Sequence, residues 1–550
     1  ALIGIIVWVV RQKQNDSADY FLGGRDATWL AIGASIFASN IGSEHLIGLA
    51  GAGASSGMAM AHWEIQGWMI LILGWVFVPF YSRSMVYTMP EFLERRYNPQ
   101  SRTILSVISL VSYVLTKVAV TVYAGGLVFQ QVFGIKELWG IDFFWIAAIG
   151  LVVLTALYTI FGGMKSVLYT SVLQTPILLL GSLIILVLGF KELGGWDEMM
   201  RVCGAVTVND YGDTMTNLIR SNDDANFPWL GALIGSAIIG FWYWCTDQFI
   251  VQRVLSGKNE KEARRGTIFG AYLKLLPVFL FLIPGMIAFA LHQKYIGAGG
   301  EGFLPMLANG TANADAAFPT LVAKLLPAGV KGLVVCGILA ALMSSLASLF
   351  NSSAMLFTID FYKRFRPETP EKKLVGIGQI ATVVIVILGI LWIPIMRSVG
   401  DVLYTYLQDV QSVLAPGIAA AFLLGICWKR TSAQGGMWGL IAGMVIGLTR
   451  LGAKVYYSNA GEVADSTFKY LFYDMNWLFF CGWMFLFCII VVIVVSLATE
   501  APTAEKIQGL VFGTATKEQK AATRASWDHW DIIHTAIILA ITAAFYWYFW

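Results

Sequence analysis

The chain has 550 residues with a formal net charge of +3, yet charged side chains make up only 13% of it. Hydrophobic residues make up 57%, and the mean hydropathy of +0.69 exceeds what soluble globular chains show. These values indicate an all-α polytopic membrane protein. They also exclude a nucleic-acid-binding chain, because the lysines and arginines lie in loops rather than in one basic stripe or tail.

Apolar runs long enough to cross a bilayer core of about 30 Å recur along the chain. The opening ALIGIIVWVV is too short to cross, so we interpret residues 1–27 as a helix remnant followed by a cytoplasmic loop. Together with the remnant, the longer runs predict about fourteen transmembrane helices. These runs lie at 28–57, 58–82, 101–134, 142–164, 166–191, 227–257, 264–292, 330–362, 372–398, 401–429, 432–456, 473–500 and 529–550.

Basic residues fall into alternate loops between these runs. They gather in 83–102, 253–265 and 363–373, and basic loops stay in the cytoplasm. The same alternation predicts that the acidic loop 192–226 and the long loop 293–329 lie outside. We therefore expect a multi-pass protein of the plasma membrane with its N-terminus outside.

Two groups of five helices stand out, residues 28–191 and 227–429. Because five is odd, consecutive groups enter the membrane from opposite sides, which is the arrangement of an inverted repeat. Residues 192–226 form the extracellular loop between the groups, and residues 430–550 are expected to add extra helices at the C-terminal end.

The first helix of each group is interrupted by polar residues. The first contains ASNIGSEHLIG at 38–48, and the second contains GFWYWCTDQ at 240–248. Unsatisfied polar groups are costly in hydrocarbon, so these segments must face protein, water or a ligand. Paired interrupted helices indicate the midplane binding site of a secondary transporter.

Other polar residues lie within the apolar runs. Glu64 suits a carboxylate at the interface and a ligand contact about equally, whereas Lys274, one turn before Pro277, lies too deep to reach the interface easily. Gln408 suits a ligand contact or an interhelical hydrogen bond. Ion-pair or helix-end roles are expected of Lys117 and Asp409.

Donors and acceptors are mixed among the polar side chains within these runs. With Asn40 and His45, the set favours a neutral polyol over an amino acid, whose carboxylate and ammonium need separate partners. Tyr243 and Trp244 add flat faces suited to the apolar face of a sugar ring, although such residues more often serve packing.

Serines repeat at helical spacing in ALMSSLASLFNSS, residues 341–353. Such serines usually let helices pack closely. Adjacent hydroxyls such as those of Ser344 and Ser345 can also replace the water around Na⁺, together with carbonyls freed where another helix unwinds.

Several stretches closely resemble the sodium/glucose cotransporters of the sodium:solute symporter family, over nearly the whole chain. They are YFLGGR (20–25), ASNIGSEH (38–45), WYWCTDQFIVQR (242–253), AYLKLLPVF (271–279), LMSSLASLFNSS (342–353) and FLLGICWKR (422–430). The resemblance implies a LeuT-like fold of two inverted five-helix repeats with extra helices at both ends. It also implies Na⁺-coupled import of a neutral hexose, glucose or galactose, by alternating access.

The resemblance also implies residue roles, position by position. Sugar contacts are expected at Asn40, His45, Glu64, Tyr243, Trp244, Lys274 and Gln408, with Tyr243 also acting as an inner gate. A sodium site is expected at the carbonyls of Ala38 and Ile41 together with Ala341, Ser344 and Ser345. An outer gate is expected at Leu49, Trp63 and Tyr404.

The chain departs from the family pattern at three positions. Ser171 stands where an aspartate linked to cation coupling is common, and Ala347 stands where a hydroxyl is associated with a second sodium. Together these favour one Na⁺ per sugar. Gly240 stands where some relatives place a polar sugar contact, so the choice between glucose and galactose stays open.

Other functions remain to be weighed against sugar symport. A symporter of myo-inositol or a monocarboxylate would keep the serine pair but should not need Glu64, Lys274 and Gln408 together, and a sugar-gated sensor or channel could use the same pocket. A primary pump is disfavoured because the chain has no G-x-x-x-x-G-K-[ST] loop, and an enzyme because no nucleophile and base set is evident. The expected partners are a sugar, Na⁺ and lipid, and a monomer suffices.

Overall fold

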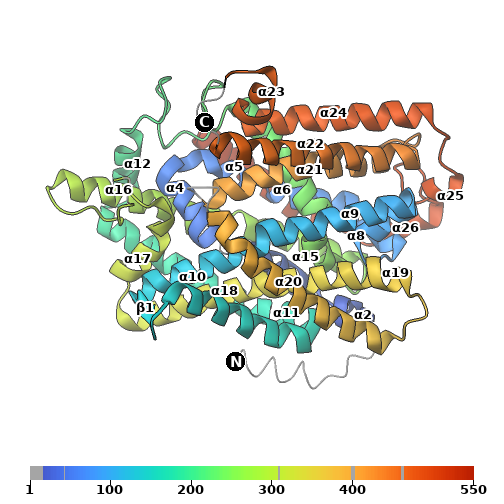
Figure 1. Ribbon diagram of the computed structural model, residues 1–550, viewed down its shortest axis with the longest axis horizontal. Coiled ribbons are helices and arrows are strands. Elements are labelled where there is room, and N and C mark those ends of the chain that lie inside the picture. Colours follow the sequence, from blue (N-terminus) through green and yellow to red (C-terminus); the bar gives the residue numbers. More distant parts are fainter. Residues whose placement is uncertain (1–16, 43, 308–309, 398–402, 460–463) are drawn as a thin grey trace.

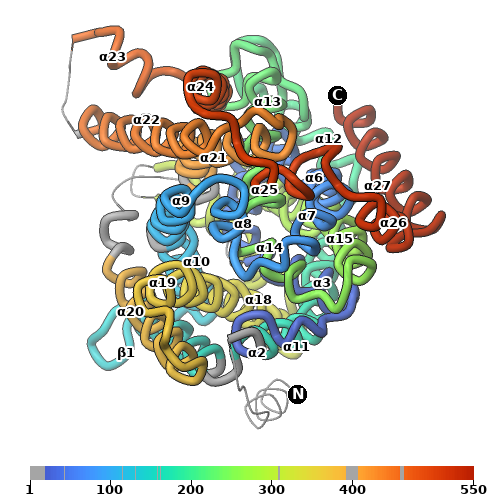
Figure 2. Tube along the Cα trace, turned by 90° about the vertical axis from the view of Figure 1, so that its right-hand side faces the viewer, coloured from blue at the N-terminus to red at the C-terminus, as the bar shows by residue number. Residues whose placement is uncertain are grey.

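The computed structural model describes residues 17–42, 44–307, 310–397, 403–459 and 464–550. The predicted helix remnant at residues 1–10 lies outside them. Many long helices run side by side along the long axis in Figure 1, and some of them, such as α24, are seen end-on in Figure 2. The chain is therefore a bundle of long, roughly parallel helices.

The first predicted group, with the short helix before it, contains α2 (Ser17–Leu22), α3 (Trp29–Asn40), α4 (Ala50–Ser56), α5 (Ala61–Glu64), α6 (Gly67–Ile72), α7 (Val78–Ser84), α8 (Met89–Arg96), α9 (Pro99–Ser112), α10 (Ala119–Phe133) and α11 (Phe143–Leu193). The outer loop contains α12 (Trp196–Gly204). The second group contains α13 (Trp229–Gly240), α14 (Gln248–Leu255), α15 (Glu260–Lys274), α16 (Ile283–Gly297), α17 (Ala317–Leu325), α18 (Ala328–Met355), α19 (Lys363–Phe365), α20 (Glu371–Arg397) and α21 (Leu403–Cys427). The remaining helices are α22 (Ala433–Asn459), α23 (Thr467–Lys469), α24 (Trp477–Ala498), α25 (Ala504–Ile507), α26 (Lys517–Ala525) and α27 (His529–Tyr548).

Wider π-helical turns interrupt several of these helices, a feature that is frequent at functional sites. They are η2 (Glu44–Leu49), η4 (Leu73–Phe77), η5 (Tyr113–Val118), η6 (Phe241–Thr246), η7 (Val278–Leu282), η9 (Leu356–Tyr362) and η10 (Tyr470–Asp474). Short 3₁₀ turns are η1 (Gly23–Arg25), η3 (Gly57–Met60) and η8 (Ala314–Ala316). Two short strands, β1 (Glu137–Leu138) and β2 (Ile141–Asp142), pair antiparallel.

The predicted spans coincide with the helices. Among the described residues, 11 helices are long and apolar enough to cross a membrane, and Trp29–Asn40 and Phe143–Leu157 are shorter apolar helices. Each predicted run from 28–57 to 529–550 falls on one of these segments. The runs 142–164 and 166–191 are joined in α11 and separated by Gly163, whose φ of +53° breaks the helix.

Exposed and buried side chains are distributed as in a membrane protein. Large apolar side chains point outward from the peripheral helices, with exposed fractions of 58% for Val187, 67% for Ile380 and 61% for Leu497. Polar side chains such as Asn40 and Lys274 are buried instead. The apolar surface fits lipid, and buried polar groups such as Asn40 and Lys274 bond to each other inside. The expected class, an all-helical polytopic membrane protein, is confirmed.

The predicted outer and inner loops lie at opposite ends of the bundle. In Figure 1, α12 and α17 lie at one end, and α8 and α19 lie at the other. This separation agrees with the alternation of the loops in the sequence. The assignment of either end to the cytoplasm stays a prediction.

Both predicted interruptions are present. Helix α3 ends at Asn40, and Ile41 is extended (φ −78°, ψ 91°) before η2 begins at Glu44. In the second, η6 ends at Thr246, and Asp247 is extended (φ −77°, ψ 128°) before α14 begins. The two breaks expose backbone groups within the bundle, where only protein, water or a ligand can satisfy them. The boundaries of the two repeats stay a prediction.

Candidate functional site

A small cavity lies beside both helix breaks. The lining residues come from α3, η2, α5, α13, η6, α15 and α21 and the turn after α5. They are Asn40, Glu44, His45, Trp63, Glu64, Gln66, Ile239, Gly240, Tyr243, Trp244, Lys274, Leu407, Gln408 and Gln411.

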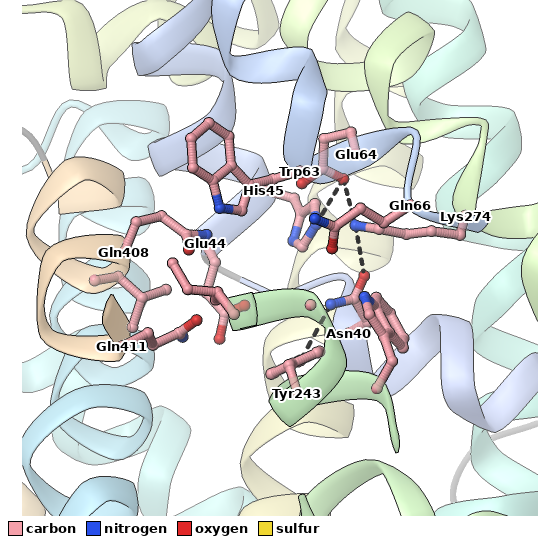
Figure 3. A pocket seen from close by; sticks show the side chains of 14 residues that line it. Asn40, Glu44, His45, Trp63, Glu64, Gln66, Tyr243, Lys274, Gln408 and Gln411 are labelled. Atoms are coloured by element: carbon pink, nitrogen blue, oxygen red, sulfur yellow. Dashed lines mark hydrogen bonds and ion pairs between the residues drawn. The ribbon is translucent and has the colours of Figure 1, made fainter. Parts of the chain in front are cut away.

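An ion pair with hydrogen-bonded neighbours forms one wall of the cavity (Figure 3). Lys274 Nζ lies 2.6 Å from Glu64 Oε2, and His45 Nε2 lies 3.2 Å from the same oxygen. Lys274 also donates to Asn40 Oδ1 at 3.3 Å. Glu64 is 1% exposed and Lys274 is 3% exposed, so the interpretation of Glu64 as a carboxylate at the interface is wrong. Charges buried this deeply persist only when paired and hydrogen-bonded.

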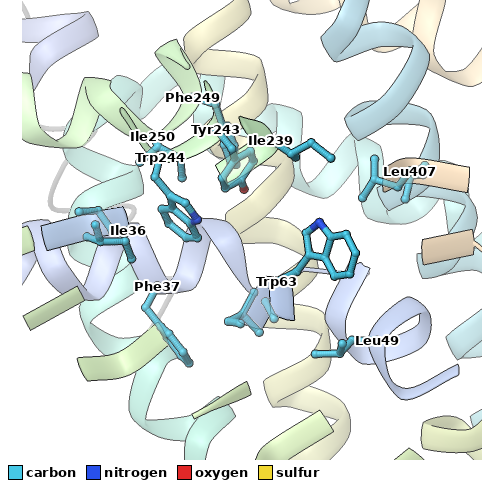
Figure 4. Close-up of a cluster of buried hydrophobic side chains, with 14 of the residues drawn as sticks. Ile36, Phe37, Leu49, Trp63, Ile239, Tyr243, Trp244, Phe249, Ile250 and Leu407 are labelled. Atoms are coloured by element: carbon cyan, nitrogen blue, oxygen red, sulfur yellow. The ribbon is translucent and has the colours of Figure 1, made fainter. Parts of the chain in front are cut away.

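Two aromatic rings lie next to this wall. Asn40 Nδ2 donates to the hydroxyl of Tyr243 at 3.1 Å, and Lys274 Nζ lies 5.3 Å from the ring centre of Trp244. The rings of Tyr243 and Trp244 meet edge to face, with centres 4.9 Å apart. Tyr243 thus contacts the polar wall through its hydroxyl and the apolar interior through its ring (Figure 4).

Glu44, Gln408 and Gln411 form a second wall, on the side of α21 (Figure 3). Gln408 Oε1 is buried without a hydrogen-bond partner among the described residues. Glu44 and Gln411 were not among the solute contacts expected from the sequence. Glu44 stood inside the quoted stretch ASNIGSEH, and Gln411 follows Gln408 by three residues and so shares its helix face.

Gln66 is a further lining residue that sequence reasoning missed. Its Nε2 donates to the carbonyl of Ser236 at 2.7 Å. A Cβ added at Gly240 would lie 2.5 Å from Gln66 Oε1. The glycine that departs from the family pattern therefore makes room for a polar side chain from another helix.

Two of the three residues of the predicted outer gate, Trp63 and Leu49, have described side chains. Trp63 lines the cavity and stacks on Trp477, with ring centres 5.5 Å apart. Leu49 is buried in the same apolar cluster (Figure 4). Tyr404 falls in the first turn of α21, where its side chain lies outside the described part of the structure.

The break after α3 contacts the serine pair of α18. Ser345 Oγ donates to the carbonyl of Ser39 at 3.0 Å, and a Cβ added at Gly42 would lie 2.5 Å from Ser345 Oγ. The amide of Gly42 donates to the carbonyl of Asn40 instead of that of Ala38, its partner in a continuous helix. Backbone carbonyls of the first break and the hydroxyl of Ser345 therefore lie close together at this point.

The remaining residues of the predicted sodium site lie close by in the chain. Ile41 is the extended residue of the break, and Ala341 lies one turn before the buried residues Ser344 and Ser345. Ser171 Oγ lies 3.2 Å from Ser344 Oγ, so a hydroxyl contacts the serine pair at the position where relatives place an aspartate. Among the described residues, no cluster of three or more His, Cys, Asp or Glu side chains is placed to hold a metal. The serine hydroxyls and backbone carbonyls at this position are uncharged oxygen ligands, which are suited to binding Na⁺.

The second break carries a buried ion pair. Lys117 Nζ lies 2.5 Å from Asp247 Oδ2, and Tyr113 donates its hydroxyl hydrogen bond to Asp247 Oδ1. Lys117 Nζ also lies 4.5 Å from the ring centre of Tyr243 and 4.2 Å from that of Phe249. The expected ion-pair role of Lys117 is confirmed, and Asp409 likewise pairs with Lys454.

Comparisons with known proteins agree on one family. The model of the sodium:solute symporter family matches residues 20–443. The sodium/myo-inositol cotransporter 2 of Homo sapiens is 36% identical over 527 residues, covering 93% of this chain and 77% of that protein. The sodium/myo-inositol cotransporter of Canis lupus familiaris is 37% identical over 536 residues, covering 93% and 74%.

A solved structure has a similar fold. It is the substrate-bound, outward-open state of a Na⁺-coupled sialic acid symporter, with a TM-score of 0.69 and 21% sequence identity. The match covers 91% of this chain and 98% of that one. At this level of identity the likeness concerns the fold alone.

Proposed function

Because the chain belongs to the sodium:solute symporter family, and is thus a LeuT-like Na⁺-coupled solute symporter and not an enzyme, we propose that its solute is a neutral cyclic polyol. Myo-inositol is the first substrate to expect and a hexose the second. The sequence motifs alone favoured glucose or galactose. The order is reversed here because the relatives at 36% and 37% identity are named for myo-inositol. The combination of Glu64, Lys274 and Gln408 is therefore no longer counted against a myo-inositol symporter.

The observation that carries this proposal is the pair Lys274–Glu64 inside a cavity that is polar on two sides. On one wall Glu64 offers an acceptor and Lys274 donors, next to His45 and Asn40. A ring with hydroxyls on its edges can donate to the first and accept from the second. Tyr243 and Trp244 supply flat faces for the ring itself.

Sodium is proposed to bind where the first break meets α18. The ligands would be the carbonyls of Ala38, Ile41 and Ala341 and the hydroxyls of Ser344 and Ser345. Oxygen ligands without full charge suit a monovalent cation that must bind and leave. Ser171 supplies no carboxylate beside the serine pair, and Ala347 supplies no hydroxyl for a second sodium, which favours one Na⁺ per solute.

One ion suffices for accumulation. A monovalent cation contributes about 2.3 kcal/mol per 100 mV of membrane potential. A tenfold sodium gradient adds about 1.4 kcal/mol. Because every 1.4 kcal/mol corresponds to a tenfold ratio, the two contributions together would concentrate a neutral solute roughly several hundredfold inside the vesicle or cell.

Coupling follows from the shared segment. Na⁺ would join the break after α3 to α18 and hold Asn40 and His45 in the arrangement that receives the solute. Because Asn40 also bonds Tyr243, release of Na⁺ loosens the contact that keeps the inner gate closed beneath the solute. Solute and Na⁺ then strengthen each other's binding by the same factor.

Uptake by proteoliposomes tests the proposal. Vesicles holding the purified protein are given labelled myo-inositol, glucose, galactose or lactate with an inward Na⁺ or K⁺ gradient. We expect Na⁺-dependent accumulation of myo-inositol, weaker accumulation of the hexoses and none of lactate. Lactate uptake would favour a monocarboxylate symporter, and solute-evoked current without accumulation would favour a sensor or channel.

A further inference from the structure

Glu44 is a buried carboxylate that faces the cavity. It begins η2 directly after the first break, and its exposed fraction is 8%. Figure 3 places it with Gln408 and Gln411, apart from Glu64. Within the described part of the chain, no hydrogen bond or ion pair of the Glu44 side chain is found, whereas Glu64 is bonded to Lys274 and His45.

A carboxylate in this position needs hydrogen-bond donors. When ionised it accepts hydrogen bonds and donates none. Water can fill this need while the cavity is empty, but a bound solute displaces that water. A solute that brings no donor to Glu44 leaves a buried acceptor without a partner, which costs more than the bond itself contributes.

This requirement separates two kinds of ring. A cyclitol such as myo-inositol has a hydroxyl on every ring carbon, so each edge can donate. A pyranose has a ring oxygen at one position, which accepts but cannot donate. When that edge faces Glu44, the ring oxygen and the carboxylate oxygen are both acceptors, so no hydrogen bond forms between them. When the ring turns away, its hydroxyls lose their match with Glu64 and Lys274 on the opposite wall.

We propose that Glu44 sets the preference of this site for a cyclitol over a pyranose by demanding a hydroxyl donor on the edge of the ring that faces α21. The unpartnered Oε1 of Gln408 adds a second acceptor to the same wall. A site built to bond a hydroxyl can reject an analogue without it strongly. The inference rests on the proposed transport of a neutral cyclic polyol.

The test compares Glu44→Gln with the wild type in proteoliposomes under the same Na⁺ gradient. Glutamine keeps the size of the side chain but adds an amide donor that can bond a ring oxygen. We expect the ratio of kcat/KM for myo-inositol to that for glucose to fall by about tenfold, mainly through a gain for glucose. The matched variant Glu44→Asp keeps the acceptor and should keep the preference for myo-inositol.

Four outcomes decide the matter. A lower ratio in Glu44→Gln with the ratio kept in Glu44→Asp supports the inference. An unchanged ratio in Glu44→Gln overturns it while leaving the proposed function in place. If Glu44→Gln takes up neither solute, stabilisation of the purified variant by each solute replaces uptake, and an equal loss for both overturns the inference. A wild-type protein that takes up neither solute removes the proposed function and this inference with it.

Discussion

Substitution of Lys274 by methionine separates a binding role of the ion pair from a structural one. Lys274 Nζ and Glu64 Oε2 are 2.6 Å apart, and both side chains are almost fully buried. Removing one partner of such a pair leaves an uncompensated charge and costs about 3–5 kcal/mol. We therefore expect Lys274→Met to lower the free energy of unfolding by that amount and to abolish solute uptake.

The double variant Lys274→Met, Glu64→Gln is the control. It removes the charge on both sides, so most of the lost stability should return, because replacing a whole buried pair is often nearly neutral. Uptake should stay absent, because the ammonium donors of Lys274 and the charged acceptor of Glu64 for the solute are gone.

Two measurements decide between these roles. Unfolding of the purified protein in detergent gives stability, and uptake by vesicles of equal protein content gives transport. A stable double variant with wild-type uptake would refute the binding role. A Lys274→Met protein as stable as the wild type would refute the reasoning about the buried pair.

Three further predictions concern sodium, solute choice and the second break. Ser345→Ala removes one proposed sodium ligand, so the Na⁺ concentration for half-maximal uptake should rise several-fold while that of the solute changes little; equal changes in both would contradict the assignment. Gln408→Glu should alter the preference among polyols without altering Na⁺ dependence, and a uniform loss for all solutes would indicate a structural role. Lys117→Met should destabilise the protein by about 3–5 kcal/mol because Asp247 loses its partner. Adding Asp247→Asn should restore most of that stability, and the pairing argument fails if melting temperatures show no such rescue.

The hydropathy of the chain and the charges of its loops were enough to predict most of the membrane-spanning helices and their order. The spans were predictable because each must be apolar over about 30 Å, and the two interruptions because polar runs such as ASNIGSEHLIG are costly in lipid. The meeting of the first break with the serine pair was instead implied by the resemblance to the sodium/glucose cotransporters. The spans and the interruptions depend on local composition, which a single sequence carries in full.

The neighbours of individual side chains were not predictable in the same way. From the sequence, Glu64 suited an interfacial carboxylate and a ligand contact about equally, and its burial beside His45 and Lys274, 210 positions away, settles only that it lies inside. The pairing of Lys117 with Asp247 spans 130 positions and depends on how two helices are rotated. Such contacts follow from packing and not from the composition of either helix.

The residues that line the cavity were likewise only partly predictable from the sequence. Gln408 was identified from its motif, whereas Gln411 and Glu44 require knowledge of which helix faces point inward. Gln66 lines the cavity because Gly240, on another helix, leaves space for it. Solute choice depends on this full set of groups, so the motifs identified the family more firmly than the substrate.

The most direct test of Na⁺-coupled polyol symport measures both fluxes in the same vesicles. Proteoliposomes receive labelled myo-inositol and ²²Na⁺ at a clamped membrane potential, and the two initial rates are compared with and without the partner substrate. The account predicts that each flux requires the other substrate and that one Na⁺ enters with each myo-inositol. Myo-inositol entry that is equal in Na⁺ and K⁺, or sodium entry without solute accumulation, would contradict it.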